Sequence, residues 1–309
     1  MEFSGTNVDF KYKYKTVSIA HLQEMQEDID KLRREGKLSD NEVYRSYIDS
    51  KKFEIPEKLP NAKSLIILAI FGNPALVNFH LNGNIHEVII PPNYYDDGTT
   101  FKDFENLIFK EIIKESGYKI EFANKLHLKL LAVRSGLGKY GRNNICYVDD
   151  WGSMMYLYAY FTDYQFEEDD WTDIKMMDQC ENCTICINNC PTSAIPTSSN
   201  NNFVINAGKC IPVYNEIQGI IPDWIPSDAH NALIGCMKCQ KPCPANRNVI
   251  NLTKRLEDIS NEETKMLLDG TIDEKLANSL SKKLKLFTPS TAERVLPVIK
   301  RNLSYLLRS

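Results

Sequence analysis

Eight of the nine cysteines lie in one stretch of the chain, at spacings typical of metal ligands. The first motif is Cys180-x2-Cys183-x2-Cys186-x3-Cys190, and Pro191 follows it. The second is Cys236-x2-Cys239-x3-Cys243, followed by Pro244, with Cys210 upstream in place of the usual first member. Three thiolates two residues apart can wrap one face of a cubane iron–sulfur cluster, and C-x2-C-x2-C-x3-C-P is the bacterial two-cluster ferredoxin signature. The pattern therefore predicts two [4Fe–4S] clusters that carry electrons one at a time.

In that signature the fourth cysteine binds the other cluster. Applied here, the rule divides the ligands into a first set, Cys180, Cys183, Cys186 and Cys243, and a second set, Cys190, Cys210, Cys236 and Cys239. Two other interpretations of the cysteines fit the pattern less well. A zinc site would favour two C-x2-C pairs separated by a finger-length loop, and a disulfide framework is typical of small secreted proteins. The ninth cysteine, Cys146, stands in a strand-like segment and is interpreted as a small buried hydrophobe.

Composition indicates a globular protein with a sizeable core. The chain has 309 residues, of which 43% are hydrophobic and 25% charged. Its net charge of −4 excludes a basic coat over nucleic acid. The first fifteen residues are polar and lack the apolar core of a secretory signal, and the longest apolar run, Leu65–Phe71, is too short to span a bilayer. We expect a cytoplasmic protein.

The pattern before residue 165 mixes helices and strands, which predicts an α+β fold. Helices are expected over 16–35, 101–115 and 126–134, and strands over 65–71, 88–90, 118–122, 145–148 and 154–161, with 65–71 a buried central strand.

The chain after residue 170 changes character. Residues 180–243 are loop-rich and cannot build an apolar core, so bound clusters would have to organise them. The remainder is helical. We therefore predict three parts: an α/β cofactor and substrate domain over 1–170, a ferredoxin-like domain over 171–248, and a helical segment over 249–309.

A glycine loop lies between the predicted helix 126–134 and the predicted strand 145–148. Gly136, Gly138 and Gly141 match G-x-G-x-x-G, but a dinucleotide fingerprint needs a strand before it and a helix after it. The order here is reversed. The glycines indicate a sharp turn or a close approach to a ligand. Arg142 and Asn143 would then offer charged and amide groups to an anionic or amide-rich ligand; the alternative is a plain tight turn.

Several stretches, in the same order, resemble the epoxyqueuosine reductase family, cobalamin-dependent iron–sulfur enzymes related to reductive dehalogenases. They are 59–69, the glycine loop 135–143, the strand 152–157 leading to Thr162-Asp163, the cysteine segments 190–195, 209–211 and 235–247, and Arg301-Asn302-Leu303.

The resemblance implies a nitroreductase-like domain that holds cobalamin with its lower base detached, facing the first cluster, and short HEAT-like helices at the end. The positions that match the corrin-facing loops are Gly136, Gly138, Gly141, Arg142, Asn143, Gly152 and Ser153. The clusters would pass electrons from an external ferredoxin- or flavodoxin-type donor to the cobalt, which reduces a substrate.

Two stretches depart from the family pattern. The family's Tyr-x-x-Gly-x-Asp-Tyr-His reads differently over 91–98 and lacks the histidine. The aspartate that the family is thought to use as proton donor has no counterpart in 120–124, where Glu121 is the nearest acid, one position off and on the other face of a strand. Glu121 is the candidate catalytic residue, and the departure predicts an altered substrate site because reduction needs a proton source within reach.

The last segment carries a local positive charge. From Lys275 to Ser309 there are eight Lys or Arg residues and one acid, Glu293. This excess could contact the phosphates of tRNA, or it could be the solvated face of amphipathic helices.

Three functions therefore compete. The first is a cobalamin-dependent reductase with an altered substrate. The second is an electron-transfer protein or corrinoid activator without its own small-molecule substrate. The third is a true tRNA epoxyqueuosine reductase with a displaced acid.

Overall fold

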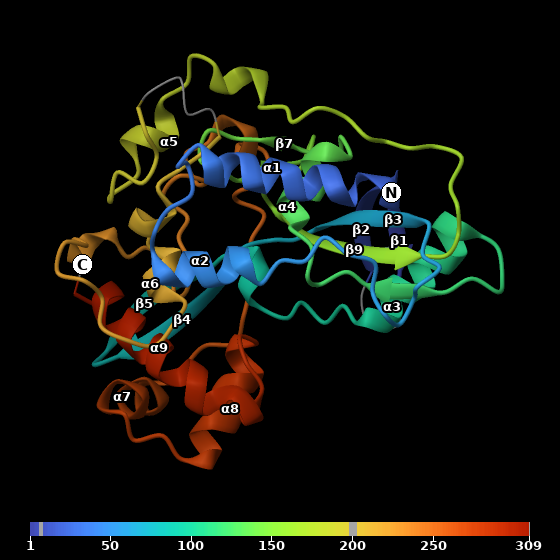
Figure 1. The fold of residues 1–309 in the computed structure, drawn as a ribbon. Coiled ribbons are helices and arrows are strands. Elements are labelled where there is room, and N and C mark those ends of the chain that lie inside the picture. The colour runs from blue at the N-terminus through green and yellow to red at the C-terminus, as the bar shows by residue number, and fades with distance from the viewer. Residues whose placement is uncertain (6–8, 198–202, 309) are drawn as a thin grey trace. The chain divides into compact units, whose positions relative to one another are not determined.

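The computed structural model describes residues 1–5, 9–197 and 203–308 (Figure 1). Contacts divide the chain into two compact units that interleave along the sequence. The first contains Met1–Phe71, Gly98–Cys183 and Ser198–Ile205, and the second contains Gly72–Asp97, Thr184–Thr197 and Asn206–Ser309. The functional division into 1–170, 171–248 and 249–309 stays a prediction.

The first unit is built on a sheet whose described strands run in the order β1-β2-β3-β9-β6. The strands are β1 (Glu2–Ser4), β2 (Asp9–Ser18), β3 (Ser64–Phe71), β6 (Ile120–Phe122) and β9 (Met155–Thr162), and each neighbouring pair is antiparallel. The predicted central strand is therefore confirmed, since β3 has a partner on each side.

Both faces of β3 are covered. Leu65, Ile67 and Ala69 pack into one cluster, with residues of α1 (Leu22–Arg34) and α4 (Leu128–Arg134). The alternate residues of β3 pack into a second cluster with α3 (Phe101–Leu107). Burial on both faces explains the uninterrupted apolar sequence of this strand. This layered arrangement confirms the predicted α+β class.

Two predicted helices differ in extent from those observed. The helix expected over 16–35 begins at Leu22, because β2 occupies the chain up to Ser18. The helix expected over 101–115 is α-helical to Leu107 and then forms a π-helical turn over Ile108–Ile113. A short helix, α2 (Glu42–Asp49), was not predicted. The small hairpin β7 (Lys139–Tyr140) and β8 (Cys146–Tyr147) follows α4.

The second unit joins segments that are far apart in sequence. A hairpin of β4 (Ala75–Leu81) and β5 (Asn84–Ile90) pairs with β10 (Lys254–Arg255) and shares one apolar core with the terminal helices. These helices are α7 (Asn261–Asp269), α8 (Glu274–Leu284) and α9 (Ala292–Leu306) (Figure 1). The predicted helical character of 249–309 is confirmed only from Asn261 on, because residues 249–260 form turns and β10. The helices pack on the hairpin rather than alone.

The cysteine-rich segments of this unit form loops and short helices, among them α5 (Ile185–Asn188) and α6 (Pro212–Asn215). Within the described ranges, no helix combines the length and apolar character required to cross a bilayer.

Helix α9 holds these loops by hydrogen bonds to their backbone. The fully buried amide of Asn302 donates to the carbonyls of Asn215 (2.8 Å) and Leu233 (2.9 Å). Arg301 donates to the carbonyls of Tyr214, Ile217 and Gly219. The Arg-Asn pair that resembles the family motif therefore fixes the segment that follows Cys210 and the segment that precedes Cys236.

Substitution of Asn302 tests this role. Asn302→Ala leaves two buried carbonyls without their donor, so we expect a loss of about 2–4 kcal/mol in the free energy of unfolding. Ser304→Ala on the same helix removes only a bond to the carbonyl four residues earlier, and a change below about 0.5 kcal/mol is expected. Denaturant unfolding of both variants provides the measurement, and equal stabilities would contradict the role.

Candidate functional site

The second cysteine set lies entirely in the second unit. The sulfur of Cys190 accepts a hydrogen bond from the backbone N–H of Ala194 (3.2 Å), and that of Cys236 accepts one from the side-chain amide of Asn231 (3.2 Å). N–H donors directed at sulfur stabilise a thiolate and are a recognised influence on iron–sulfur clusters. This donor set fits a cubane.

Electrostatic effects show that members of the second set lie near one another. Burial raises the pKa of the Cys236 thiol, the bond from Asn231 opposes this rise, and the charge of Cys190 adds to it. The pKa of Tyr94, raised by burial and then by Glu216, also responds to both Cys210 and Cys236. The phenol of Tyr94 donates to the carboxylate of Glu216. Proximity of Cys190 and Cys236 agrees with the crossing rule, whose ligand assignment stays a prediction.

The first set is divided between the units: Cys180 and Cys183 belong to the first, and Cys186 and Cys243 to the second. In the described part of the chain, no three His, Cys, Asp or Glu side chains converge as they would around a single metal ion. A cubane places its four thiolates around four irons, so its ligands stand farther apart than those of a mononuclear site.

The glycine loop is preceded by α4 and followed by β8, which confirms that it is not a dinucleotide fingerprint. Gly136 has a φ of +69°, which favours glycine. A Cβ on Gly138 would lie 2.6 Å from the sulfur of Cys146, and one on Gly141 would lie 2.6 Å from Oδ1 of Asn143. The loop's own packing thus requires glycine at these two positions.

Arg142 connects this loop to the first cysteine motif. Its Nη2 donates to the carbonyls of Cys180 (2.6 Å) and Glu181 (3.1 Å). The side chain is buried, and its Nε has no hydrogen-bond partner. A buried donor without an acceptor is costly, so the position suits a ligand that supplies an acceptor. Asn143 instead uses its amide internally, donating to the hydroxyl of Tyr147 (2.9 Å).

The remaining predicted site residues lie in or near the sheet. Gly152 has a φ of +56° in the turn before β9, and Ser153 beside it is buried. Glu121 lies on β6 opposite Phe161 and forms an ion pair with Lys58 (3.8 Å). The roles of all three stay predictions. Cys146 is buried, which confirms its interpretation as a small buried hydrophobe, and burial raises its pKa to about 12.

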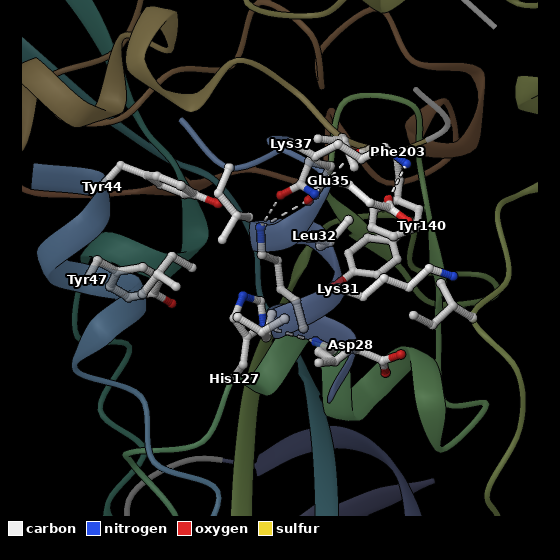
Figure 2. Close-up of a pocket in the computed structure, with 18 residues that line it drawn as sticks. Asp28, Lys31, Leu32, Glu35, Lys37, Tyr44, Tyr47, His127, Tyr140 and Phe203 are labelled. Atoms are coloured by element: carbon white, nitrogen blue, oxygen red, sulfur yellow. Dashed lines mark hydrogen bonds and ion pairs between the residues drawn. The ribbon is translucent and has the colours of Figure 1, made fainter. Parts of the chain in front are cut away.

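A cavity of about 240 Å³ in the first unit was not predicted (Figure 2). It is lined by residues of α1, α2 and α4 and by Tyr140 and Asn144 of the hairpin that carries the glycine loop. Aromatic rings form part of its wall: Tyr44, Tyr47, and Tyr140 stacked on Phe203 with centroids 4.3 Å apart. Neither a motif nor a periodicity marks these residues, because the cavity is assembled from separate segments.

His127 gives the cavity a defined hydrogen-bond donor. Its Nδ1 accepts from the backbone N–H of Leu130 (3.2 Å) and caps α4, so the neutral ring carries its proton on Nε2. Burial lowers its pKa to about 3, with Lys129 adding to the effect, and the ring is therefore neutral near pH 7. Lys129 is anchored by donating to the backbone and side-chain oxygens of Asn144 (3.0 and 2.8 Å).

Comparison with known proteins finds a family match in the cysteine-rich region. Residues 179–246, which include all eight motif cysteines, match the family model described as a 4Fe-4S double cluster binding domain. Epoxyqueuosine reductase of Staphylococcus aureus is 36% identical over 121 residues, covering 39% of this chain and 30% of that protein. The Synechocystis enzyme of the same name is 28% identical over 210 residues, covering 64% of this chain and 67% of that protein.

Solved structures extend the similarity to the whole fold. Epoxyqueuosine reductase from Streptococcus thermophilus superposes with a TM-score of 0.66 at 19% identity, covering 96% of this chain and 76% of that one. A structure of epoxyqueuosine reductase with a modified tRNA stem loop gives a TM-score of 0.64 at 20% identity. The curated matches are more restricted: those to the Staphylococcus aureus and Bacillus subtilis enzymes cover 30% and 29% of those proteins.

The pKa of His127 predicts a pH dependence of stability. Between pH 6.5 and about 3 the unfolded chain binds a proton at this position that the folded chain does not, so acidification below pH 6.5 favours unfolding. Asparagine retains the helix cap without titrating. From about pH 7 to pH 5 we expect the wild type to lose up to about 2 kcal/mol more than His127→Asn. Parallel curves of unfolding free energy against pH would contradict the assignment.

Cysteine variants test the ligand sets. Cys236→Ser should abolish only the second cluster, lowering the iron content to about half that of the wild type. Cys146→Ser serves as the matched control and should retain full iron. Iron analysis and electron paramagnetic resonance of anaerobically prepared protein give the measurement, and full iron in Cys236→Ser would exclude this residue as a ligand.

Proposed function

Because this chain is a divergent member of the epoxyqueuosine reductase family, we propose that it is a cobalamin-dependent iron–sulfur reductase. Its cysteines hold two [4Fe–4S] clusters, and its first unit holds the corrinoid through the loops at 136–143 and 152–153. When bound, these groups supply one-electron chemistry that ends at the cobalt and the substrate. The residues of the chain position the two kinds of cofactor and control access of water and protons.

The observation that carries the proposal is the position of Arg142. Its guanidinium is bonded to the backbone at Cys180, the first ligand of the first cluster, and its buried Nε still requires an acceptor. The amide-bearing edge of a corrin offers acceptors of this kind. One residue would then contact the ligand loop of a cluster and the corrinoid, which keeps the donor and acceptor of the electron close together.

The cavity beneath the same hairpin supports the proposal. Its aromatic walls and the Nε2–H of His127 suit a flat aromatic base with a nitrogen acceptor, such as the detached lower base of cobalamin. The neutral imidazole donates without placing a charge in the cavity.

Under this proposal the substrate differs from that of typical epoxyqueuosine reductases, and Glu121 is the candidate proton donor. A solved relative was obtained with a tRNA stem loop. Here two of the eight cations of the tail have internal partners: Lys283 pairs with Glu263 (2.7 Å), and Arg301 binds backbone carbonyls. The others lie on α8 and α9 or directly after them and leave tRNA as a candidate substrate.

Cobalamin binding tests the proposal. Wild-type protein with both clusters should bind added cobalamin anaerobically, with a change in the visible spectrum. Arg142→Met should weaken binding about tenfold or more, the loss expected for one hydrogen bond from a charged group. Lys110→Met, which removes an exposed cation of the first unit outside these loops, should bind like the wild type.

Iron content of each variant separates loss of the corrinoid from loss of a cluster. Wild-type protein that holds its clusters but takes up no cobalamin would contradict the proposal and favour an electron-transfer protein. If cobalamin binds, restoration of queuosine in a deficient strain identifies a true epoxyqueuosine reductase, and no restoration leaves the altered substrate.

A further inference from the structure

A hollow of about 720 Å³ in the second unit lies against the loop that carries the second cysteine motif. Met237, Lys238, Lys241 and Pro242, which intersperse with Cys236, Cys239 and Cys243 along the chain, line one side of it. Strand β5 supplies the opposite side through residues 86–89. The hollow is thus lined by chain neighbours of three predicted cluster ligands, Cys236, Cys239 and Cys243.

A hydrogen-bond path connects the hollow with a ligand sulfur. Asn231, which lines it, donates to the sulfur of Cys236 (3.2 Å) and accepts from the N–H of Met237 (2.7 Å). Next to it, His230 is buried and stacks on Tyr305 with centroids 4.4 Å apart, and neither ring nitrogen has a partner. A molecule entering the hollow therefore meets polar groups adjacent to the cluster.

The charge of the hollow is positive. Lys238 and Lys241 contribute two cations to its lining. The lining acid, Glu87, is paired with Arg255 (2.6 Å). From Ala229 to Leu256 the sequence contains five Lys or Arg residues and no Asp or Glu. Such a surface attracts a negatively charged partner and accelerates its association.

We propose that this hollow is the docking surface of an acidic one-electron carrier protein, so that electrons enter the chain at the second cluster. The accessible apolar side chains of Leu76, Ile89, Pro242 and Leu306 form the contact area, and the two lysines orient the carrier. In each event the reduced carrier loses one electron and the oxidised second cluster gains it, with no bond made or broken. The inference rests on the clusters of the proposed function but does not require cobalamin.

The test uses cluster-loaded protein without cobalamin and a reduced flavodoxin as the probe. Stopped-flow absorbance gives the second-order rate of cluster reduction. We expect the wild-type rate to fall as salt is added, and the rate of Lys238→Glu/Lys241→Glu to be at least about tenfold lower at low salt. Lys265→Glu/Lys275→Glu, which changes the charge of the same unit equally at exposed helix positions, should stay within about twofold of the wild type.

Reduction by dithionite should be unaffected in every variant, because this small reductant needs no docking surface. If the double variant loses iron, the exposed single variant Lys241→Glu replaces it, with a smaller decrease expected. Equal rates of wild type and variant with flavodoxin would overturn the proposal. A double variant whose clusters are reduced by flavodoxin at the wild-type rate but which binds tRNA more weakly would also overturn it, because the hollow would then be an RNA-binding site. Failure to bind cobalamin bears only on the reductase proposal.

Discussion

The cysteine-bearing loops have a small apolar cluster of their own, Ile211, Ile221, Ile225 and Ala229, and otherwise depend on how their backbone is held. Asn302 and Arg301 of α9 donate to carbonyls of 214–219 and 233 from a helix that has its own apolar core. Asn215 extends this network by bonding both the N–H and the carbonyl of Gly235, immediately before Cys236. The polypeptide thus positions the segments that flank Cys210 and Cys236, and a bound cluster would complete the fold of these loops. Metal and helix contribute to the same folding free energy, as in other small metal-binding domains.

The first unit is ordered by a different constraint. Both faces of β3 are buried against different apolar clusters. A shift of one residue in its pairing would turn every side chain of the strand to the opposite face, so the register is strongly defined. The rigid sheet supports α4, and α4 supports the hairpin with the glycine loop. His127 caps that helix and also faces the cavity, so one residue serves both the scaffold and the proposed corrinoid site.

The sequence predicted what depends on local pattern. The cysteine spacing, the apolar run of β3 and the reversed order around the glycines each have a short-range physical cause. Two local signals were missed: the alternation of Phe10, Tyr12 and Tyr14 with lysines in β2, and Asn82-Gly83, the preferred turn of the β4–β5 hairpin. The core shared by that hairpin and the terminal helices, and the cavity at His127, could not be predicted because they join residues up to hundreds of positions apart. Arg142 was singled out from its place after the loop, but its bond to Cys180 required the fold.

The central claim is that the two clusters serve a corrinoid held by the first unit. Electron paramagnetic resonance of cluster-loaded protein given cob(II)alamin under anaerobic conditions tests it most directly. The account predicts a spectrum without nitrogen splitting from the lower base, because the base is detached and bound by the protein. A spectrum identical to that of free cob(II)alamin, with the base still on the cobalt, would contradict it.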